Sequence, residues 1–595
     1  MRSPKLSKIN HTYSNLQWGV EMKICDVMIE KFRSIKKASF HMNEITAVVG
    51  ENNSGKTSVL RAINAVLNYS FEEDFFQNRR HQYAAKNNTH ITITLSEISE
   101  NDYFTEYIQD GKLTIKFSFI YIENKRRLSV IKGMDLIPID DSFLEELSKS
   151  IMYVYIPAGR SNKDVLWNSG SIFRELVLNY AAQYTEKKDR ISGQVRVAAQ
   201  KIHDSVLKRL ENQLGKLYMQ NKLENFNMSF PQDLDYTFLI DKMTLSVNEY
   251  GTEYPLQECG SGIKSLVVIA MHRANALLRN GTTVLGIEEP EANLHPQAQK
   301  RFILSLKNTI SSSDTQAIFT THSTVLVDSL SHDDILLIRR IQDEKRGFLS
   351  SVSKIPVDFW AKYHIEEFKH YQFFNYKNSD FFFSKYVVLG ESKNDCQVFQ
   401  KLIEPEIGDK IADISFLDAG GVDFIKYPYF LLKELQIPFI IIVDRDFFFP
   451  YLVNNNLDES RSSITGLPRY ADTLKDDDVI NDIFNTETQK RRLVNAHKAG
   501  YRKFFEFIKE HKLLSMNYCL EMDLTCSSRA RQAFYALLTV LPQNQTQKHL
   551  LLESPKGLKK IDRILNVLDI IPKTSYPESY TKIKNSILNR IESCV

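Results

Sequence analysis

The sequence predicts an α/β protein of several domains, and three observations lead to this prediction. The chain has 595 residues, which exceeds one hydrophobic core because domains average about 150 residues. An apolar strand, a glycine-rich loop and a helical pattern follow one another at residues 45–67. Strand and helix patterns alternate again from Lys385, and acidic residues stand where the apolar strands end.

The glycine-rich loop at residues 50–57 reads GENNSGKT and follows the apolar run at 45–49. A loop between a strand and a helix start wraps phosphates with its backbone N–H groups and the positive end of the helix dipole. We expect Lys56 to reach the β- and γ-phosphates and Thr57 to bind Mg²⁺ through its hydroxyl. The residues expected to bind the nucleotide here are Gly50, Asn53, Ser54, Gly55, Lys56 and Thr57.

Composition excludes several classes of protein. The 76 Lys and Arg residues nearly balance 73 Asp and Glu residues, so any contact with nucleic acid must come from local basic runs such as 125–127 and 490–492. Each of these runs fits a solvated surface equally well. Six scattered cysteines without a C-x-x-C pair argue against structural zinc and disulfides. No apolar run approaches ~18 residues and no signal peptide is visible, so we expect a cytoplasmic protein without membrane contact.

Strand patterns dominate the region from Met22 to about residue 130, and a strand is also expected at 236–240. Residues 1–21 are polar and read as a tail, with Met22 as an alternative natural start. A helical, charge-rich block lies between, at about 171–225. Its apolar residues recur at helical spacing, namely Val195, Ala198, Ala199, Ile202, Val206 and Leu210. The block is either a dimerisation insertion or an ordinary helical subdomain, and the sequence leaves both open.

Glu288 and Glu289 end the apolar run 283–287. Nucleotide hydrolysis needs one carboxylate at the Mg²⁺ and another beside the attacking water. We assign Glu288 to the metal and Glu289 to the water. The continuation PEANLHP at 290–296 distinguishes this segment from an ordinary surface pair of acids.

A glycine cluster at 260–262 opens a mostly apolar helix and offers a second anion-binding helix start, although it also fits a simple cap. His322 follows a strand-like run, where a capping or core role is the alternative. The order of loop, glycine cluster, acidic strand end and His322 resembles ABC-type ATPases. This resemblance implies that ATP binds between two heads, that Ser261 and Gly262 complete the site of a partner head, and that His322 lies near the γ-phosphate. The cluster departs from the usual LSGGQ signature.

Four acids in the back half also follow apolar strands. Glu391 follows the run 385–389 with Asp395 four residues later, and Asp444 and Asp446 follow the run 437–443. Carboxylates at the carboxyl ends of parallel strands converge at one crevice, and Asp-x-Asp spacing puts two on the same side. Phosphodiester hydrolysis needs such a cluster, because metal ions generate hydroxide and neutralise the leaving oxygen. We therefore expect Mg²⁺ or Mn²⁺ here, with a solvated turn as the alternative for the Asp pair.

This acidic pattern resembles a Toprim domain, in which Glu391 takes the glutamate position and Asp444 and Asp446 form the Asp-x-Asp. Ser392 stands where that family usually has glycine. An ABC-type head followed by Toprim resembles the OLD family of ATP-dependent nucleases, from residue 22 to the end of the chain. The segments YIPAGR at 155–160 and EEPEANLHP at 288–296 are also similar to that family.

The OLD resemblance implies another acidic metal ligand and a transition-state lysine near the C-terminus. Asp523 is our first match to the acid, with Glu521 second. Lys556 is our first choice for the lysine, ahead of Lys559 and Lys560.

The predicted domains follow from these assignments. They are a tail at 1–21, the ATPase in two parts at 22–165 and 231–382, a helical insertion at 166–230, a Toprim domain at 383–530, and a helical region at 531–595 that completes it.

Two functions are compatible with this organisation. The first is a metal-dependent DNA endonuclease gated by ATP, acting as a homodimer or higher oligomer. The resemblance relates it to bacterial anti-phage effectors, some of which pair with a helicase-like subunit or with a reverse transcriptase and its DNA. The second is a RecF-like or SMC-like DNA-binding ATPase for repair or clamp loading, with a structural Toprim domain. The short helical block argues against long-armed SMC relatives.

Overall fold

A computed structural model describes residues 22–98, 102–160, 171–182, 184–210, 245–249, 251–278, 281–312, 314–344, 346–366 and 379–594. The predicted tail at 1–21 and the strand expected at 236–240 lie outside these ranges. The described residues form two compact units. The first contains the residues up to Val48, Gly55–Ser329 and Ile341–Ser351, and the second contains Val49–Ser54, Leu330–Arg340 and those from Val352 onward.

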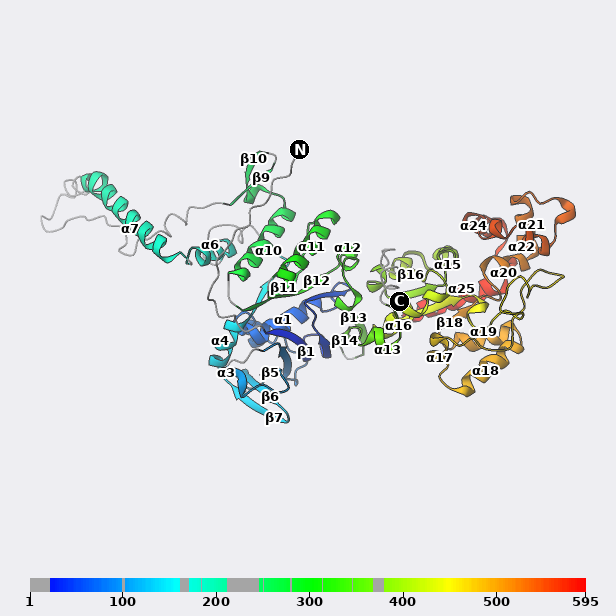
Figure 1. Cartoon of the computed structure of the whole chain (residues 1–595), viewed down its shortest axis with the longest axis horizontal. Helices are drawn as coiled ribbons and strands as arrows, with labels where there is room; N and C mark the ends of the chain where they lie inside the picture. The colour runs from blue at the N-terminus through cyan, green and yellow to red at the C-terminus, as the bar shows by residue number, and fades with distance from the viewer. Residues whose placement is uncertain are drawn as a thin grey trace. The chain divides into compact units, whose positions relative to one another are not determined.

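Figure 1 labels many of the elements before residue 363. The strands are β1 (Lys23–Phe32), β2 (Ile35–His41), β3 (Ile45–Gly50), β4 (Thr89–Ser96), β5 (Leu113–Ile120), β6 (Lys125–Lys132), β7 (Asp135–Ile139), β8 (Ile151–Ile156), β9 (Ser246–Glu249), β10 (Thr252–Pro255), β11 (Thr282–Glu288), β12 (Thr315–Thr321), β13 (Ile335–Asp343) and β14 (Gly347–Ser353). The α-helices are α1 (Lys56–Leu67), α2 (Glu73–Gln77), α3 (Asp102–Thr105), α4 (Asp141–Ser150), α6 (Ile172–Ala182), α7 (Thr185–Ile202), α10 (Ser261–Leu277), α11 (Pro296–Ser312), α12 (Thr324–Val327) and α13 (Phe359–Lys362).

The first unit combines an antiparallel and a parallel run of strands. Strands β7, β6, β5, β4, β1 and β2 are antiparallel neighbours in this order. Their side chains alternate between buried and half-buried, as in β5, because one face of such a sheet meets solvent. Strands β12, β11 and β8 form the parallel run. Nearly all residues of β11 are buried, as parallel strands require.

The register of the parallel run positions the predicted ATPase residues. Glu288 on β11 aligns with Thr320 on β12, and Ile287 aligns with Ile156 on β8. The segments that follow the three strands therefore leave the sheet at the same edge. They carry Glu289, His322 and the residues after Ile156.

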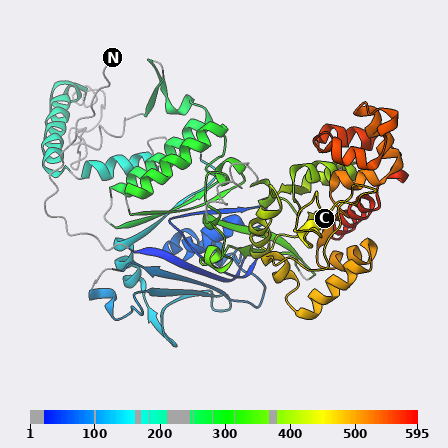
Figure 2. The same ribbon diagram turned by 45° about the vertical axis from the view of Figure 1, so that its right-hand side comes forward.

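The helices predicted in the block at 171–225 are present as α6 and α7, and residues 211–225 lie outside the described ranges. Helix α6 packs on α10 through an apolar cluster that includes Ile172, Phe173, Val268 and Met271. Figures 1 and 2 both show α10 and α11 side by side, where Arg273 donates to the Ser305 carbonyl at 2.8 Å.

The second unit contains a four-stranded sheet. Its strands are β15 (Tyr386–Gly390), β16 (Ile414–Asp418), β17 (Phe439–Val443) and β18 (Leu513–Ser515). Its helices are α15 (Lys393–Ile407), α16 (Lys426–Glu434), α17 (Asp478–Ile483), α18 (Glu487–Lys498), α19 (Tyr501–Lys509), α20 (Leu520–Cys526), α21 (Ser528–Leu537), α22 (Gln547–Glu553), α23 (Pro555–Leu558), α24 (Ile561–Ile570) and α25 (Glu578–Cys594).

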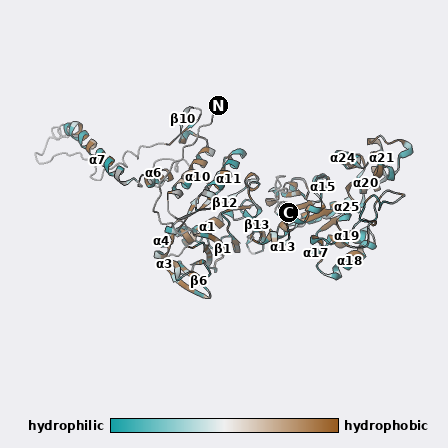
Figure 3. Cartoon of the chain, viewed as in Figure 1, coloured by the Kyte–Doolittle hydropathy of each residue, from teal (hydrophilic) through white to brown (hydrophobic). Residues whose placement is uncertain are grey.

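All neighbouring strands of this sheet are parallel, in the order β16, β15, β17, β18. Gly390 aligns with both Asp418 and Ile442, so Glu391 and Asp444 emerge at one edge. Every residue of the apolar strands β15 and β17 is buried. Figure 3 shows the hydropathy of the residues along the chain. Helices of the C-terminal region, including α21, α24 and α25, share one core with them. The predicted α/β fold class is confirmed.

No helix of the described ranges has both the length and the apolar character needed to cross a bilayer.

Gly286 tests the packing of β11. An added Cβ would stand 1.9 Å from the hydroxyl of buried Tyr153, which donates to the Leu60 carbonyl at 3.1 Å. We expect Gly286→Ala to destabilise the first unit by about 1–3 kcal/mol through overpacking. Thermal unfolding checks this, with Gly193→Ala in α7 as the control because nothing lies within 4 Å of its Cβ position. Equal melting temperatures for both variants would contradict the expectation.

Candidate functional site

The phosphate loop requires glycine at two positions. Gly50 has φ +150° and an added Cβ would lie 2.0 Å from the Ile338 carbonyl oxygen. Gly55 caps helix α1 with φ +105°, and its Cβ would lie 2.6 Å from the Ser350 hydroxyl. Side chains rarely tolerate such backbone angles, so the glycines allow a backbone that can wrap an anion.

The other predicted nucleotide-binding residues lie in or directly after this loop. Asn53 has φ +59° and Ser54 is buried. Lys56 is the first residue of α1 and is only 6% exposed, and Thr57 follows it. Lys56 and Thr57 thus form the first turn of α1 directly after the glycine-rich loop, and a helix start favours anions.

His322 directly follows β12 and lies in the electrostatic range of Lys56. The main-chain N–H of His322 donates to a carboxylate oxygen of Glu291 at 2.6 Å, and the Thr321 hydroxyl donates to the same oxygen at 2.8 Å. Burial and the charge of Lys56 lower the pKa of His322 to about 4. The imidazole is therefore neutral near pH 7 and can donate or accept one hydrogen bond.

Glu288 is held by two donors from the segment after β8. The Tyr155 hydroxyl donates to one carboxylate oxygen at 2.6 Å, and the Ala158 N–H donates to the other at 3.1 Å. Glu289 has φ +41° and its N–H donates to the Thr320 carbonyl at 3.1 Å. Sequence reasoning noticed this YIPAGR segment only through a family resemblance and attached no role to it.

The glycine cluster forms the start of helix α10, whose first residue is Ser261. A Cβ at Gly262 would lie 2.5 Å from the Asn293 carbonyl oxygen. The small residue therefore lets the start of α10 approach the loop that follows Glu288 and Glu289.

In the second unit, the ends of two strands bring acids together. The Asp444 N–H donates to the Glu391 carboxylate at 3.1 Å, and the Glu391 N–H donates to the Ile442 carbonyl at 3.0 Å. Burial and the charges of Asp446 and Asp395 raise the pKa of Glu391 to about 7. Two segments that lie 53 residues apart in the sequence thus share one polar site.

Asp395 and Asp444 lie deep in the same group. Asp395 is 4% exposed and forms a capping box with Ser392, whose N–H and hydroxyl donate to it at 2.9 and 2.7 Å. Burial and the charge of Glu521 raise the pKa of Asp395 to about 6. Burial and the charge of Glu391 raise the pKa of Asp444 well above its ordinary value.

Asp446, the second acid of the Asp-x-Asp, accepts a hydrogen bond from the Tyr451 hydroxyl at 3.3 Å. Asp446 also raises the pKa of both Glu391 and Asp444 through its charge. The structure thus brings together all four acids predicted at the strand ends.

The candidates for the C-terminal acid and lysine differ from one another in their contacts. Asp523 accepts the N–H groups of Asn517 and Tyr518 at 2.8 and 2.9 Å, so its carboxylate holds a loop. Glu521, the second choice, raises the pKa of both Asp395 and Asp444. A helix turns by about 100° per residue, so residues two apart on α20 face different sides.

Of the C-terminal candidates, Lys559 lies near these acids, and Lys475 also acts on Glu391 through its charge, which lowers the pKa of that carboxyl. The Lys559 ammonium lies 3.6 Å from Glu521, and the charges of Glu521 and Asp444 raise its pKa. Lys556, the first choice, has an exposed side chain on the short helix α23. The sequence contained both lysines, but only the packing of the helices decides which one meets the site.

The donor set suits a divalent cation. Glu391, Asp395, Asp444, Asp446 and Glu521 supply only carboxylate oxygens, the ligands that Mg²⁺ and Mn²⁺ prefer. Burial and repulsion between these charges raise the pKa of Glu391, Asp395 and Asp444, and a cation would relieve that cost. Within the described ranges, no three His, Cys, Asp or Glu side chains stand at ready metal-ligand spacing. The roles of these acids as metal ligands therefore belong to the proposal below.

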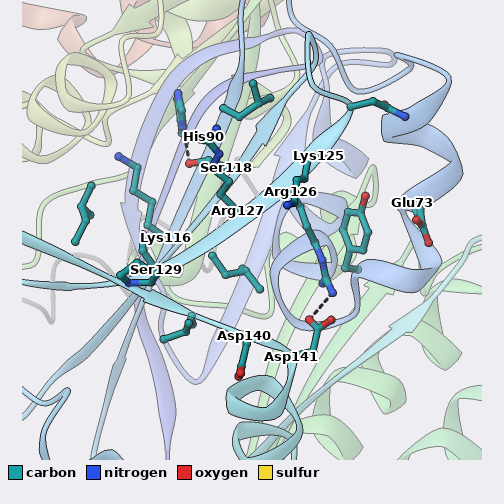
Figure 4. A pocket seen from close by; sticks show the side chains of 17 residues that line it. Glu73, His90, Lys116, Ser118, Lys125, Arg126, Arg127, Ser129, Asp140 and Asp141 are labelled. Atoms are coloured by element: carbon teal, nitrogen blue, oxygen red, sulfur yellow. Dashed lines mark hydrogen bonds and ion pairs between the residues drawn. The ribbon is translucent and has the colours of Figure 1, made fainter.

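The basic run at 125–127 lines a separate pocket of about 800 Å³ on the first unit (Figure 4). Arg126 pairs with Asp141 and lies over the Tyr69 ring at 4.4 Å, while Arg127 pairs with Glu123 at 2.7 Å. Both arginines already have carboxylate partners, which agrees with their interpretation as part of a solvated face.

Known proteins match both units. The family model described as "AAA ATPase domain" matches residues 22–151 and 119–327, together just over half of the chain. The model "Overcoming lysogenization defect protein-like, TOPRIM domain" matches residues 382–446. The fold and the two sites thus define an enzyme that joins an ATPase unit to a Toprim unit.

Curated relatives point to one family. The chain is 23% identical to the OLD nuclease of Thermus scotoductus over 71% of this chain and 81% of that protein. It is 22% identical to the Old nuclease of Escherichia phage P2 over 73% of this chain and 79% of that protein. It is 20% identical to the endonuclease GajA of Bacillus cereus over 71% of this chain and 75% of that protein. This chain therefore belongs to the AAA ATPase domain family, its second unit carries an OLD-like Toprim domain, and its curated relatives are nucleases.

Among solved structures, an SMC head bound to the C-terminal winged-helix domain of ScpA is 15% identical to this chain. The match covers 57% of this chain and 99% of that one, with a TM-score of 0.36.

The raised pKa values predict how stability changes with pH. Without metal, folded Glu391 and Asp395 keep protons up to about pH 7 and 6, whereas unfolded carboxyls release them near pH 4. The folded state binds more protons in this window, so these groups make it less stable as pH rises. We expect the chelator-treated protein to melt at a lower temperature at pH 8 than at pH 5.5.

Glu391→Gln is the matched variant for this measurement, because it keeps the shape and removes one titrating group. We expect its melting temperature to fall less over the same pH range. An identical pH dependence in wild type and variant would show that Glu391 does not titrate as described.

Proposed function

We propose that this protein is a DNA endonuclease whose acidic group binds Mg²⁺ or Mn²⁺ and whose cutting is gated by ATP on the first unit. The observation that carries the proposal is the group formed by Glu391, Asp395, Asp444, Asp446 and Glu521. Carboxylates that repel one another cost stability, and a function that needs a cation explains why they stand together.

In this proposal the acids and Lys559 have different roles. The five carboxylates would hold the metal, which supplies a hydroxide and neutralises charge on the reacting phosphate. The Glu391 carboxylate is oriented by the Asp444 N–H, and Ser392 orients Asp395. Lys559, beside Glu521, would stabilise negative charge on the phosphate oxygens.

The first unit would bind and hydrolyse ATP. Lys56 would contact the phosphates and Thr57 would bind Mg²⁺ together with Glu288, while Glu289 would orient the attacking water. The neutral His322 near Lys56 would contact the γ-phosphate. Ser261 and Gly262 at the start of α10 would contact ATP held by a second copy of the chain, which makes the protein a homodimer or a higher oligomer.

The domain limits, location and context complete the proposal. ATPase parts at 22–165 and 231–382, a dimerising insertion at 166–230, and a nuclease at 383–530 completed by 531–595 would act together in the cytoplasm. The likeness to OLD nucleases and to the endonuclease GajA supports a role in anti-phage defence, alone or with a helicase-like subunit or a reverse transcriptase and its DNA. A structural Toprim domain, as in the DNA-clamp alternative, would have no use for repelling acids.

Cleavage of plasmid DNA tests the nuclease. We expect wild type to nick or cut DNA with Mg²⁺ or Mn²⁺, and Glu391→Ala and Asp444→Ala to lose at least about 10²-fold in rate because the metal loses its ligands. Lys56→Ala should retain the metal-dependent site but lose the response of cutting to ATP. Nicking that persists in both acid variants would refute the proposed nuclease site.

The two C-terminal lysines provide a matched pair. We expect Lys559→Ala to slow cleavage by about 10²-fold because it removes a cation beside the acids. Lys556→Ala should cleave within about twofold of wild type, since Lys559 and not Lys556 pairs with Glu521. Cleavage rates at saturating metal measure the difference, and the opposite ranking would restore Lys556 as the catalytic lysine.

A further inference from the structure

Arg160 joins three acceptors from two separate elements of the first unit. One of its terminal nitrogens donates to the Ser265 hydroxyl at 2.5 Å and to the Glu289 carbonyl at 3.3 Å. The other donates to the Glu288 carbonyl. The guanidinium therefore binds the main chain of both acids assigned to ATP hydrolysis and a side chain of helix α10.

Ser265 connects helix α10 to Arg160. It is 4% exposed and lies one helical turn after Ser261, at the end of the helix that carries the glycine cluster. Its hydroxyl contacts Arg160 directly, so a shift of this end of α10 moves one anchor of the guanidinium.

Helix α10 is also fixed to the helical insertion. Asn275 donates to Glu175 at 2.8 Å and accepts from Asn179 at 2.9 Å, and an apolar cluster packs α6 on α10. Arg160 itself stands at the start of the chain segment that leads into α6. The insertion, α10 and the acid pair are thus linked by continuous contacts.

We propose that Arg160 is a positioning residue that couples helix α10 to the acid pair Glu288 and Glu289. This inference rests on the proposed ATP hydrolysis of the same unit. When the start of α10 contacts ATP held by a second copy of the chain, Arg160 fixes the position of the main chain that carries the two carboxylates. Tyr155 and Ala158, from the same segment, hold the Glu288 carboxylate itself.

The chemistry of arginine suits this task. A planar guanidinium has five N–H donors in a fixed geometry, so it can hold two carbonyls and a hydroxyl at once. A shift of about 1 Å in a catalytic group costs about 10²-fold in rate. Loss of Arg160 should therefore lower the rate of the chemical step and leave nucleotide binding in place.

Arg160→Gln tests the proposal, with Arg273→Gln as its matched control. Arg273 lies on helix α10, as Ser265 does. Its guanidinium donates to the hydroxyl and the carbonyl of Ser305, and none of its described hydrogen bonds reaches Glu288 or Glu289. We expect Arg160→Gln to reduce kcat for ATP about 10- to 100-fold with nucleotide affinity within about twofold of wild type. Arg273→Gln should keep the wild-type kcat. Binding of a fluorescent ATP analogue and melting temperatures accompany the rate measurements.

Ser265→Ala provides the second arm and keeps the proposal testable if Arg160→Gln folds poorly. Ser265→Ala removes one of the three described hydrogen bonds of Arg160, so kcat should fall about threefold to tenfold. The kcat of Arg160→Lys should lie between those of wild type and Arg160→Gln. The double variant Arg160→Gln/Ser265→Ala should be no slower than Arg160→Gln, because both changes break the same link.

Wild-type kcat in either Arg160→Gln or Ser265→Ala would overturn the inference. So would equal losses in Arg160→Gln and Arg273→Gln, since a general packing defect would then explain both. A wild type that hydrolyses no ATP would instead refute the ATP-hydrolysis part of the proposed function, and the inference with it. DNA cleavage by wild type that is lost in Glu391→Ala would show that the nuclease unit is active, and would so distinguish a failure of ATP hydrolysis from a failure of the nuclease.

Discussion

Carboxylates that gather at the ends of parallel strands are the constraint on which the second unit depends. The alignment of Gly390 with Ile442 forces Glu391 and Asp444 to emerge side by side, and the Asp444 N–H binds the Glu391 side chain. Helices α15 and α20 then contribute Asp395 and Glu521 to the same place. Each acid raises the pKa of its neighbours, so the fold keeps an electrostatic cost that an apolar core would avoid.

The first unit handles its acids differently. Glu288 accepts hydrogen bonds from the Tyr155 hydroxyl and the Ala158 N–H. The main chain of Glu288 and Glu289 is fixed by Arg160, and Glu289 is further bonded to Thr320. One unit therefore orients its acids in advance, while the other concentrates charge that a cation can compensate.

The sequence was sufficient for features with short-range causes. The loop at 50–57 needs glycine where φ is positive, and the fully apolar strands at 283–287 and 437–443 are typical of parallel sheets with both faces covered. Because parallel strands end at a common edge, the grouping of Glu391, Asp444 and Asp446 could also be predicted. The choice between Glu521 and Asp523 could not, since it depends on which side of α20 faces the sheet.

By itself, the sequence determined the α/β class, the two sets of strand-end acids, the phosphate loop and the glycine cluster at a helix start, because each follows from residue type and local spacing. Only the tertiary structure decided which lysine meets the acids, that Asp523 holds a loop, and that the YIPAGR segment grips the hydrolysis acids. The physical reason is range: these last features are contacts between residues from 6 to more than 100 positions apart, and packing sets them rather than local pattern.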